Sequence, residues 1–194
     1  MILYLTTADT DLLTLRSALD GLPDEFPAIR TANVTDWEGQ DEAAHAFLDA
    51  WLHQARVVVL RLLGGKRAHP AAFERIVSFC QQRDIPLLAW PGDQEPDPEL
   101  LAATNVPLSL YQQAMLYAVY GGVKNFRNLF RMISDTWLGT AFGYEEPAEL
   151  PWTGIYRKGS LEALDYAAWR KTVDPERPVV GILFYRAHWM SHNL

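Results

Sequence analysis

The C-terminal part of the chain contains side chains that could bind a planar, anionic ligand. Arg186 and His188 lie between Tyr185 and Trp189, directly after an apolar run that begins at Pro178. Ligands of open α/β sheets bind at the carboxyl ends of the strands, where a cation, an imidazole and aromatic rings together can hold such a molecule. We therefore take Arg186 and His188 as candidate substrate-binding residues. The alternative interpretation is that both side chains only cap the end of a strand and bond to its backbone.

His188 is also a candidate metal ligand, because His192 follows it four residues later. Two histidines at this spacing share one face of a helix and could bind one metal ion. A zinc metalloprotease motif requires Glu directly after the first histidine, but Trp189 stands there. The metalloprotease interpretation is therefore excluded, and chance spacing is the simpler explanation of the pair taken alone.

A third candidate is Lys66, which follows two glycines between an expected strand and an expected helix. Phosphate-binding loops occupy this place, because the unpaired N–H groups of a helix start attract anions. A Walker A loop would need Gly at position 60 and Ser or Thr at position 67, where the chain has Leu60 and Arg67, and a G-x-G-x-x-G fingerprint is also missing. We therefore expect this chain to bind neither ATP nor NAD. Lys66 could still hold a carboxylate, although a tight turn explains the glycines more simply.

The elements that must position these side chains follow an α/β pattern. Over the first 90 residues, short apolar runs alternate with amphipathic stretches, which is typical of a doubly wound, mostly parallel sheet of the flavodoxin-like kind. The strands are expected at Ile2–Thr6, Ala28–Val34, Arg56–Leu62 and Ile85–Trp90, and helices at about 9–20, 41–54 and 70–83.

The next segment predicts a helix from Ser109 to about Leu138, which Gly121-Gly122 could interrupt. Its second half has two faces: an apolar stripe suited to the core, and a face that carries Lys124, Arg127 and Arg131. We expect the charged face to be solvated, or alternatively to dock an anionic partner.

The chain is expected to comprise three parts. Residues 1–138 form an N-terminal α/β domain with a long C-terminal helix, and residues 139–177, which are irregular with a short helix, form a connector. Residues 178–194 begin a second, truncated domain, because the strand expected from Pro178 to Tyr185 is strongly apolar. A parallel strand buried on both faces requires further strands and helices to cover it.

Composition excludes several classes of protein. The chain has 194 residues, a mass of 22.0 kDa and a net charge of −7, so it lacks the excess of Lys and Arg that a general nucleic-acid binder requires. The single cysteine, Cys80, rules out an internal disulfide and any multi-cysteine cluster and fits a reducing cytoplasm. The N-terminus lacks the pattern of a signal peptide, and the apolar runs are too short to span a membrane.

Four segments in the last two-thirds of the chain carry a family resemblance. They are Leu60–Lys66, the Pro91-Gly92-Asp93 loop with Asp97–Leu100 after it, Pro151–Tyr156 and Pro178–Trp189, and the last of these is the most specific. Together they resemble the large subunit of cobaltochelatase and, more distantly, the porphyrin-binding large subunit of magnesium chelatase.

The resemblance implies the N-terminal part of a subunit that binds a tetrapyrrole and a metal. The implied reaction is ATP-dependent insertion of Co²⁺ into hydrogenobyrinic acid a,c-diamide in cobalamin biosynthesis, with ATP hydrolysed by AAA+-type partner subunits rather than by this chain. The segment alone is expected to be inactive, with the catalytic residues located elsewhere in the polypeptide. Two alternatives remain open: a magnesium chelatase subunit acting on protoporphyrin IX, and a free-standing flavodoxin-like interaction module without enzymatic activity.

Overall fold

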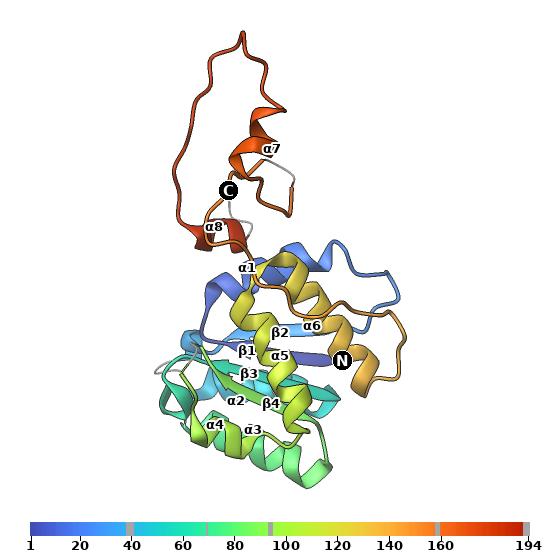
Figure 1. Ribbon diagram of the computed structural model, residues 1–194. Coiled ribbons are helices and arrows are strands. Elements are labelled where there is room, and N and C mark those ends of the chain that lie inside the picture. Colours follow the sequence, from blue (N-terminus) through green and yellow to red (C-terminus); the bar gives the residue numbers. More distant parts are fainter. Residues whose placement is uncertain (38–40, 69, 93–94, 158–159, 192–194) are drawn as a thin grey trace.

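A parallel β-sheet forms the centre of the computed structural model, which describes residues 1–37, 41–68, 70–92, 95–157 and 160–191. Within these residues, four strands pair in the order β2-β1-β3-β4, all parallel (Figure 1). Their bounds are β1 (Ile2–Thr6), β2 (Ile29–Asn33), β3 (Val57–Leu62) and β4 (Leu87–Pro91). The four strand positions predicted for the first 90 residues are thereby confirmed.

Helices cover both faces of the sheet. Successive strand residues point to opposite sides, so alternate residues pack against different helix layers. Tyr4 and Val59 pack against α1 (Asp9–Leu19), α5 (Leu108–Tyr120) and α6 (Gly122–Trp137). Leu3 and Leu60 pack in a second core against the other layer. That layer contains α2 (Asp41–Trp51), α3 (Pro70–Arg83) and α4 (Pro98–Ala103). The predicted doubly wound α/β class is confirmed.

The long helix predicted from Ser109 to Leu138 is broken into α5 and α6 at Gly121-Gly122. Both glycines have positive φ angles, 66° and 83°, which residues with a Cβ rarely adopt. The N–H of Gly121 closes α5 by donating to the carbonyl oxygen of Tyr117 at 3.0 Å. The break turns α6 so that it runs beside α1 over the sheet (Figure 1).

The expectation that the polar face of α6 is solvated was wrong. Of the three basic side chains on this face of α6, only that of Lys124 is exposed, and it forms an ion pair with Glu145. Arg127 and Arg131 donate to the carbonyl oxygens of Ala18 and Gly21, at the end of α1. The periodicity of α6 correctly identified its apolar stripe, but it could not show that a second helix and the following segment would cover its polar side.

The irregular segment after α6 is attached to this polar face by side chains that bind its backbone. Asn125, which is buried, donates to the carbonyl oxygen of Ala148 at 2.8 Å and accepts from its N–H at 3.0 Å. Asp135 accepts from the N–H groups of Phe142 and Gly143 at 2.9 and 2.8 Å. Residues 140–148 therefore belong structurally to the α/β body, although they form no helix or strand.

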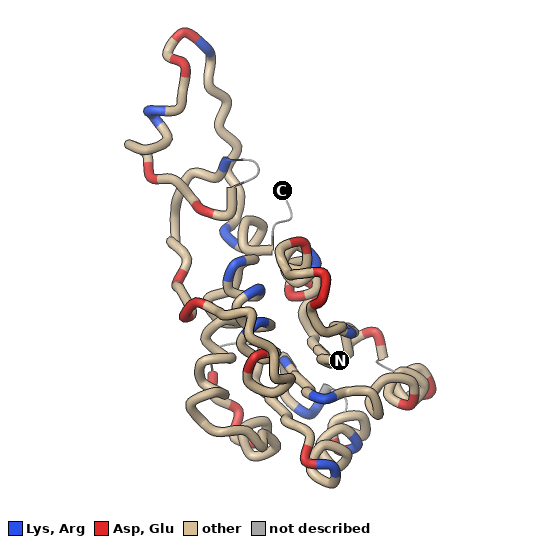
Figure 2. The backbone as a smooth tube through the Cα atoms, turned by 90° about the vertical axis from the view of Figure 1, so that its right-hand side faces the viewer, with Lys and Arg blue, Asp and Glu red and all other residues tan. Residues whose placement is uncertain are grey.

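From about residue 151 to residue 185 the chain leaves this body as a long projecting segment (Figure 1). The segment contains one antiparallel bridge, between Ile155 and Leu164, and the short helix α7 (Tyr166–Arg170). Helix α8 (Arg186–Met190) returns the chain to the body. Figure 2 shows the same projection from the side, with both acidic and basic residues on it.

The strand predicted from Pro178 to Tyr185 does not form. These residues lie in extended, exposed chain, with Val180 87% and Leu183 101% exposed. A strand is defined by hydrogen bonds to a neighbouring strand, and no other segment of the described chain pairs with this one.

In the described residues, no helix is both long enough and apolar enough to cross a bilayer.

Candidate functional site

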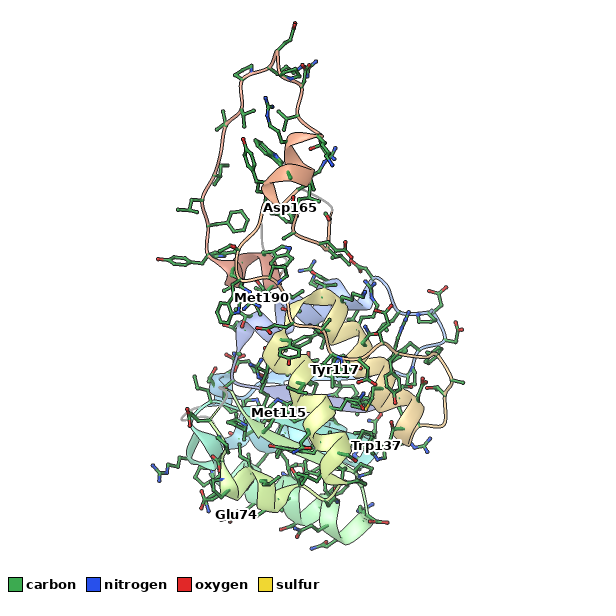
Figure 3. The ribbon with its side chains drawn as sticks, viewed as in Figure 1. Glu74, Met115, Tyr117, Trp137, Asp165 and Met190 are labelled. Carbon is green, nitrogen blue, oxygen red and sulfur yellow. The ribbon has the colours of Figure 1, made fainter. Side chains whose placement is uncertain are left out.

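A cavity of about 190 Å³ lies where the projecting segment leaves and rejoins the body. One wall comes from the outgoing chain, with Trp152 and Tyr156, and the other from the returning chain, with Phe184, Arg186 and Trp189. Two of the four sequence segments that carry the family resemblance therefore meet around one cavity. Figure 3 shows the side chains of this region, with Met190 at the junction with the body.

Aromatic rings supply much of the cavity wall. Tyr156 and Phe184 contact each other edge to face, with centroids 6.1 Å apart and planes at 85°. Trp189 is buried, whereas Trp152 is 73% exposed and presents its ring to solvent. A flat, largely apolar ligand could stack on such surfaces.

Arg186 holds the two walls together. Its Nε donates to the carbonyl oxygen of Pro151 at 3.0 Å, and one Nη donates to that of Leu150 at 2.8 Å. The guanidinium also lies 4.7 Å from the ring centroid of Trp152, in cation–π contact. Arg186 thus fixes the outgoing chain to the first turn of α8 and places a positive charge in the cavity wall.

Of the two candidates Arg186 and His188, His188 has the more exposed side chain. It lies on α8, two residues after Arg186, and its side chain is exposed to solvent. His192, the second histidine of the metal-binding pair considered from the sequence, lies outside the described residues. Within the part of the chain that the structure describes, no three His, Cys, Asp or Glu side chains form a group that could hold a metal ion.

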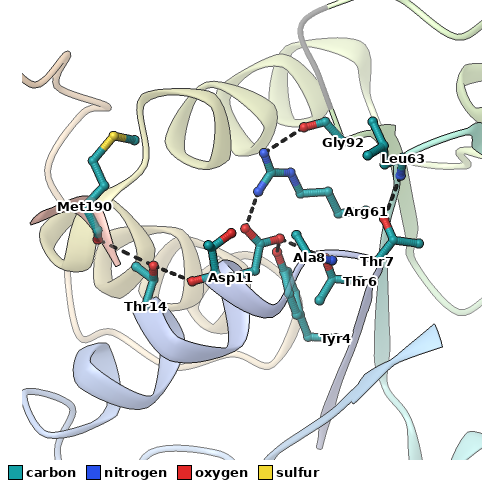
Figure 4. A network of polar contacts seen from close by, with 11 residues as sticks. Tyr4, Thr6, Thr7, Ala8, Asp11, Thr14, Arg61, Leu63, Gly92 and Met190 are labelled. Atoms are coloured by element: carbon teal, nitrogen blue, oxygen red, sulfur yellow. Dashed lines mark hydrogen bonds and ion pairs between the residues drawn. The ribbon is translucent and has the colours of Figure 1, made fainter. Parts of the chain in front are cut away.

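Helix α8 rests on the body close to the carboxyl ends of the central strands. The hydroxyl of Thr14, in α1, lies 3.4 Å from the carbonyl oxygen of Met190 (Figure 4). A Cβ atom at Gly121 would meet the Met190 side chain, so the glycine break between α5 and α6 also makes room for α8. The position of the cavity wall is therefore set by the fold of the α/β body.

The place where flavodoxin-like sheets bind ligands is filled by the protein's own side chains. This is the crevice beyond β1 and β3, where the connections from neighbouring strands leave to opposite faces. Asp11 is buried there, paired with Arg61, and it accepts hydrogen bonds from Tyr4 and Thr6 at 2.9 and 2.8 Å (Figure 4). Burial and the neighbouring Asp11 raise the pKa of the Tyr4 hydroxyl well above its usual value, so Tyr4 stays protonated and donates to the carboxylate.

Lys66 lies apart from Arg186 and His188. Its ammonium forms a 2.8 Å ion pair with Glu99, which raises the pKa of Lys66. It lines a different, open cavity, beside Gly64, Pro91 and Asp97. Asp97 in turn caps α4 by accepting from the N–H groups of Glu99 and Leu100. The structure therefore brings Arg186 and His188 onto one short helix and separates Lys66 from them.

Three aromatic residues of the cavity were not among the predicted site residues: Trp152, Tyr156 and Phe184. For Trp152 and Tyr156, the signal in the sequence was the concentration of aromatic rings in a segment with little helical or strand periodicity, where such rings have no regular core to fill. Phe184 lies in the segment predicted as a strand, so it carried no such signal. Only the fold shows that two segments about 30 residues apart enclose one space.

Comparison with known proteins relates the whole chain to cobaltochelatase subunits. Residues 115–194 match the family described as CobN/Magnesium Chelatase. The chain is 32% identical over 193 residues to the aerobic cobaltochelatase subunit CobN of Pseudomonas aeruginosa, which covers 99% of this chain and 15% of that protein. It is 29% identical over 198 residues to an uncharacterised protein of Methanocaldococcus jannaschii, covering 98% of this chain and 15% of that one.

A solved structure agrees with these relatives. The catalytic subunit of cobaltochelatase from Mycobacterium tuberculosis matches 99% of this chain with a TM-score of 0.68 and 29% identity, over 14% of its own length. The chain thus spans 14–15% of the length of the three relatives.

Proposed function

Because the chain belongs to the CobN/magnesium chelatase family, we propose that it is the N-terminal part of the tetrapyrrole- and metal-binding large subunit of a cobaltochelatase. The reaction of the whole enzyme is ATP-dependent insertion of Co²⁺ into hydrogenobyrinic acid a,c-diamide, in cobalamin biosynthesis in the cytoplasm. ATP is hydrolysed by AAA+-type partner subunits. The 194-residue segment alone is inactive.

The observation that carries the proposal is the aromatic cavity with Arg186 in its wall. A tetrapyrrole precursor is flat and apolar over its ring faces and carries carboxylate and amide groups at its edge. Trp152 and the Tyr156–Phe184 pair offer rings for the flat surface, and Arg186 offers a cation for the edge.

The size of the cavity limits what this segment can contribute. Its volume of about 190 Å³ is below the roughly 300–1,000 Å³ of a typical small-molecule site. We therefore assign it one edge of the macrocycle, with the remaining contacts made by other parts of the much longer subunit.

His188 has the chemistry that metal insertion needs. Two pyrrole-type N–H protons must leave the macrocycle and the incoming metal must lose water, so an imidazole could accept a proton or bind the metal on its way in. His188 is exposed on α8 between Arg186 and Trp189, which line the cavity, although its own side chain is not part of the lining. Lys66, which is paired with Glu99 in a separate cavity, is assigned no contact with the macrocycle.

The test is equilibrium titration of the full-length subunit with hydrogenobyrinic acid a,c-diamide, followed by the quenching of tryptophan fluorescence. Arg186→Ala and His188→Ala should each weaken binding by about 1 to 3 kcal/mol, the usual range for loss of a charged hydrogen bond. Lys66→Ala is the matched control and should bind normally. Unchanged affinity in both test variants would contradict their assignment to the site.

The same titration with protoporphyrin IX separates the alternative of a magnesium chelatase subunit. Tighter binding of protoporphyrin IX than of the corrin precursor would favour that alternative. The interaction-module alternative depended on a free basic face on α6, but the structure pairs Lys124 with Glu145 and bonds Arg127 and Arg131 to the end of α1. Nothing in the described part of the chain specifically favours this second function.

A further inference from the structure

The extended segment from Val179 to Tyr185 has the properties of a buried strand but lies in solvent. Val180, Ile182, Leu183 and Tyr185 are each more than 80% exposed. The segment contains no charged residue, and the described chain provides no backbone hydrogen bond to the amides of residues 179–184. A long, apolar, unpaired segment of this kind readily forms strand pairs with other chains.

The exposure is on both faces of the segment. Successive residues of a strand point to opposite sides, and Ile182 and Leu183, which are neighbours, are 82% and 101% exposed. A strand that pairs at the edge of a sheet normally keeps one polar face, whereas a strand that is apolar on both faces is typical of the interior of a parallel α/β sheet.

The chain immediately after the segment continues the same pattern. Tyr185 has extended backbone angles, φ −73° and ψ 144°, and α8 begins at the next residue. A strand followed at once by a helix is the start of a β-α unit, which places the helix against a sheet built from further parallel strands.

The three relatives indicate where those strands come from. Each contains about six to seven times as much chain as this one, which covers 14–15% of their length. Residues 179–185 also lie inside the segment that matches the family, 115–194. The needed strands and covering helices can therefore belong to the same polypeptide.

We propose that residues 179–185 form an interior strand of a second α/β sheet, whose neighbouring strands come from a later region of the same cobaltochelatase-length polypeptide. This inference rests on the proposed function only for the identity of that polypeptide. Pairing fixes the Phe184 side of the cavity and places Arg186 and His188 at the carboxyl end of the new strand. The cavity described above is thus one side of a site that is completed when the second sheet forms.

Cysteine labelling tests the inference directly, because the only cysteine of the chain, Cys80, is fully buried. The variants Ile182→Cys and Leu183→Cys are each treated with a maleimide in two forms: the isolated 194-residue chain, and the native polypeptide purified from its source cells. Ser109→Cys, on the exposed start of α5, is the matched control and should react at the same rate in both. No tetrapyrrole is added, so the result does not depend on the macrocycle titration above.

We expect both test cysteines to react quickly in the 194-residue chain and at least about tenfold more slowly in the native polypeptide, since a buried residue reacts only during local opening. Equal rates at either position would overturn the proposal. Slow reaction in a native polypeptide of only 22 kDa would also overturn it, because the neighbouring strands would then come from another molecule.

Discussion

Asp11 and Arg61 form a buried ion pair that joins the first turn of α1 to the end of β3, 50 residues apart in the sequence. The Asp11 and Arg61 side chains are 5% and 15% exposed. Arg61 also donates to the carbonyl oxygen of Gly92 at 2.9 Å, and Asp11 accepts from Thr6, so the pair connects the ends of β1, β3 and β4 (Figure 4). This arrangement fills the crevice that a flavodoxin-like sheet uses for ligands, and it agrees with locating the ligand cavity in the projecting segment instead.

Breaking this pair should destabilise the body strongly. Arg61→Met leaves the carboxylate of Asp11 buried without its cation, which is expected to lower the free energy of unfolding by about 3–5 kcal/mol. The double variant Asp11→Asn/Arg61→Met removes the charge as well and should be clearly more stable than the single variant. Urea unfolding measures both values.

Arg75→Met is the control for this experiment. Its ion pair with Asp49 is exposed, at 33% and 68%, so its loss should change stability by about 0–1 kcal/mol. If Arg61→Met were no more harmful than Arg75→Met, the Asp11–Arg61 pair would not hold the strand ends together.

The attachment of residues 140–148 to α6 depends on Asn125. Asn125→Ala removes both of its hydrogen bonds to Ala148 and leaves those backbone groups without partners, at an expected cost of about 1–3 kcal/mol. Amide hydrogen exchange at Ala148 should become faster in the variant. Thr136→Ala, on an exposed position of the same helix, should leave that exchange rate unchanged, and equal rates in all three proteins would contradict the account.

Asp135 should make the same attachment sensitive to acid. Burial alone would raise the pKa of Asp135, but hydrogen bonds from Thr140 and from the amides of Phe142 and Gly143 outweigh it and lower the pKa in the folded protein. A carboxyl whose folded pKa is lowered stabilises the fold above its unfolded pKa, and this stabilisation is lost as the pH falls through the folded value.

The variant Asp135→Asn isolates this effect. The difference in unfolding free energy from the parent protein should be about 1 kcal/mol at neutral pH and should shrink at pH values below the folded pKa of Asp135, because the carboxyl of the parent protein then becomes protonated. A difference that stays constant between these pH values would show that the charge of Asp135 does not hold residues 142 and 143.

Cys80 should be chemically inert in the folded protein. Burial raises the pKa of its thiol to about 12, so almost no thiolate exists near neutral pH, and only the thiolate is the reactive form. A thiol reagent should therefore react with the parent chain only after denaturant is added. Rapid reaction of the folded chain would show that Cys80 becomes accessible without unfolding.

The α/β body could be read from the sequence because its elements are defined by local patterns. Runs such as Val57–Leu60 are apolar at every position, and helix starts carry recognisable capping residues such as Asp97, which caps α4. The strand order β2-β1-β3-β4 is that of the flavodoxin-like sheet predicted from the alternation of strands and helices.

The rest depended on contacts between distant residues. Asn125 and Asp135 look like ordinary polar positions of an amphipathic helix, and only the path of residues 140–148 shows that they bind backbone groups. Arg186 and His188 were chosen as candidates from the sequence, but the hydrogen bonds of Arg186 to Leu150 and Pro151 could not be predicted from it. The segment at 178–185 has the composition of a strand, yet a strand also requires a partner, which a local pattern cannot provide.

The central claim, that the cavity formed by residues 151–156 and 182–189 binds a tetrapyrrole, is tested most directly at Trp152. The full-length subunit and its Trp152→Ala variant are each titrated with hydrogenobyrinic acid a,c-diamide by equilibrium dialysis, which does not depend on the fluorescence of the residue removed. Loss of a stacking ring worth about 1 kcal/mol predicts roughly fivefold weaker binding in the variant, while the variant Trp51→Phe, whose substitution lies on α2 away from the cavity, should bind normally. Equal affinity of the parent subunit and Trp152→Ala would contradict the claim.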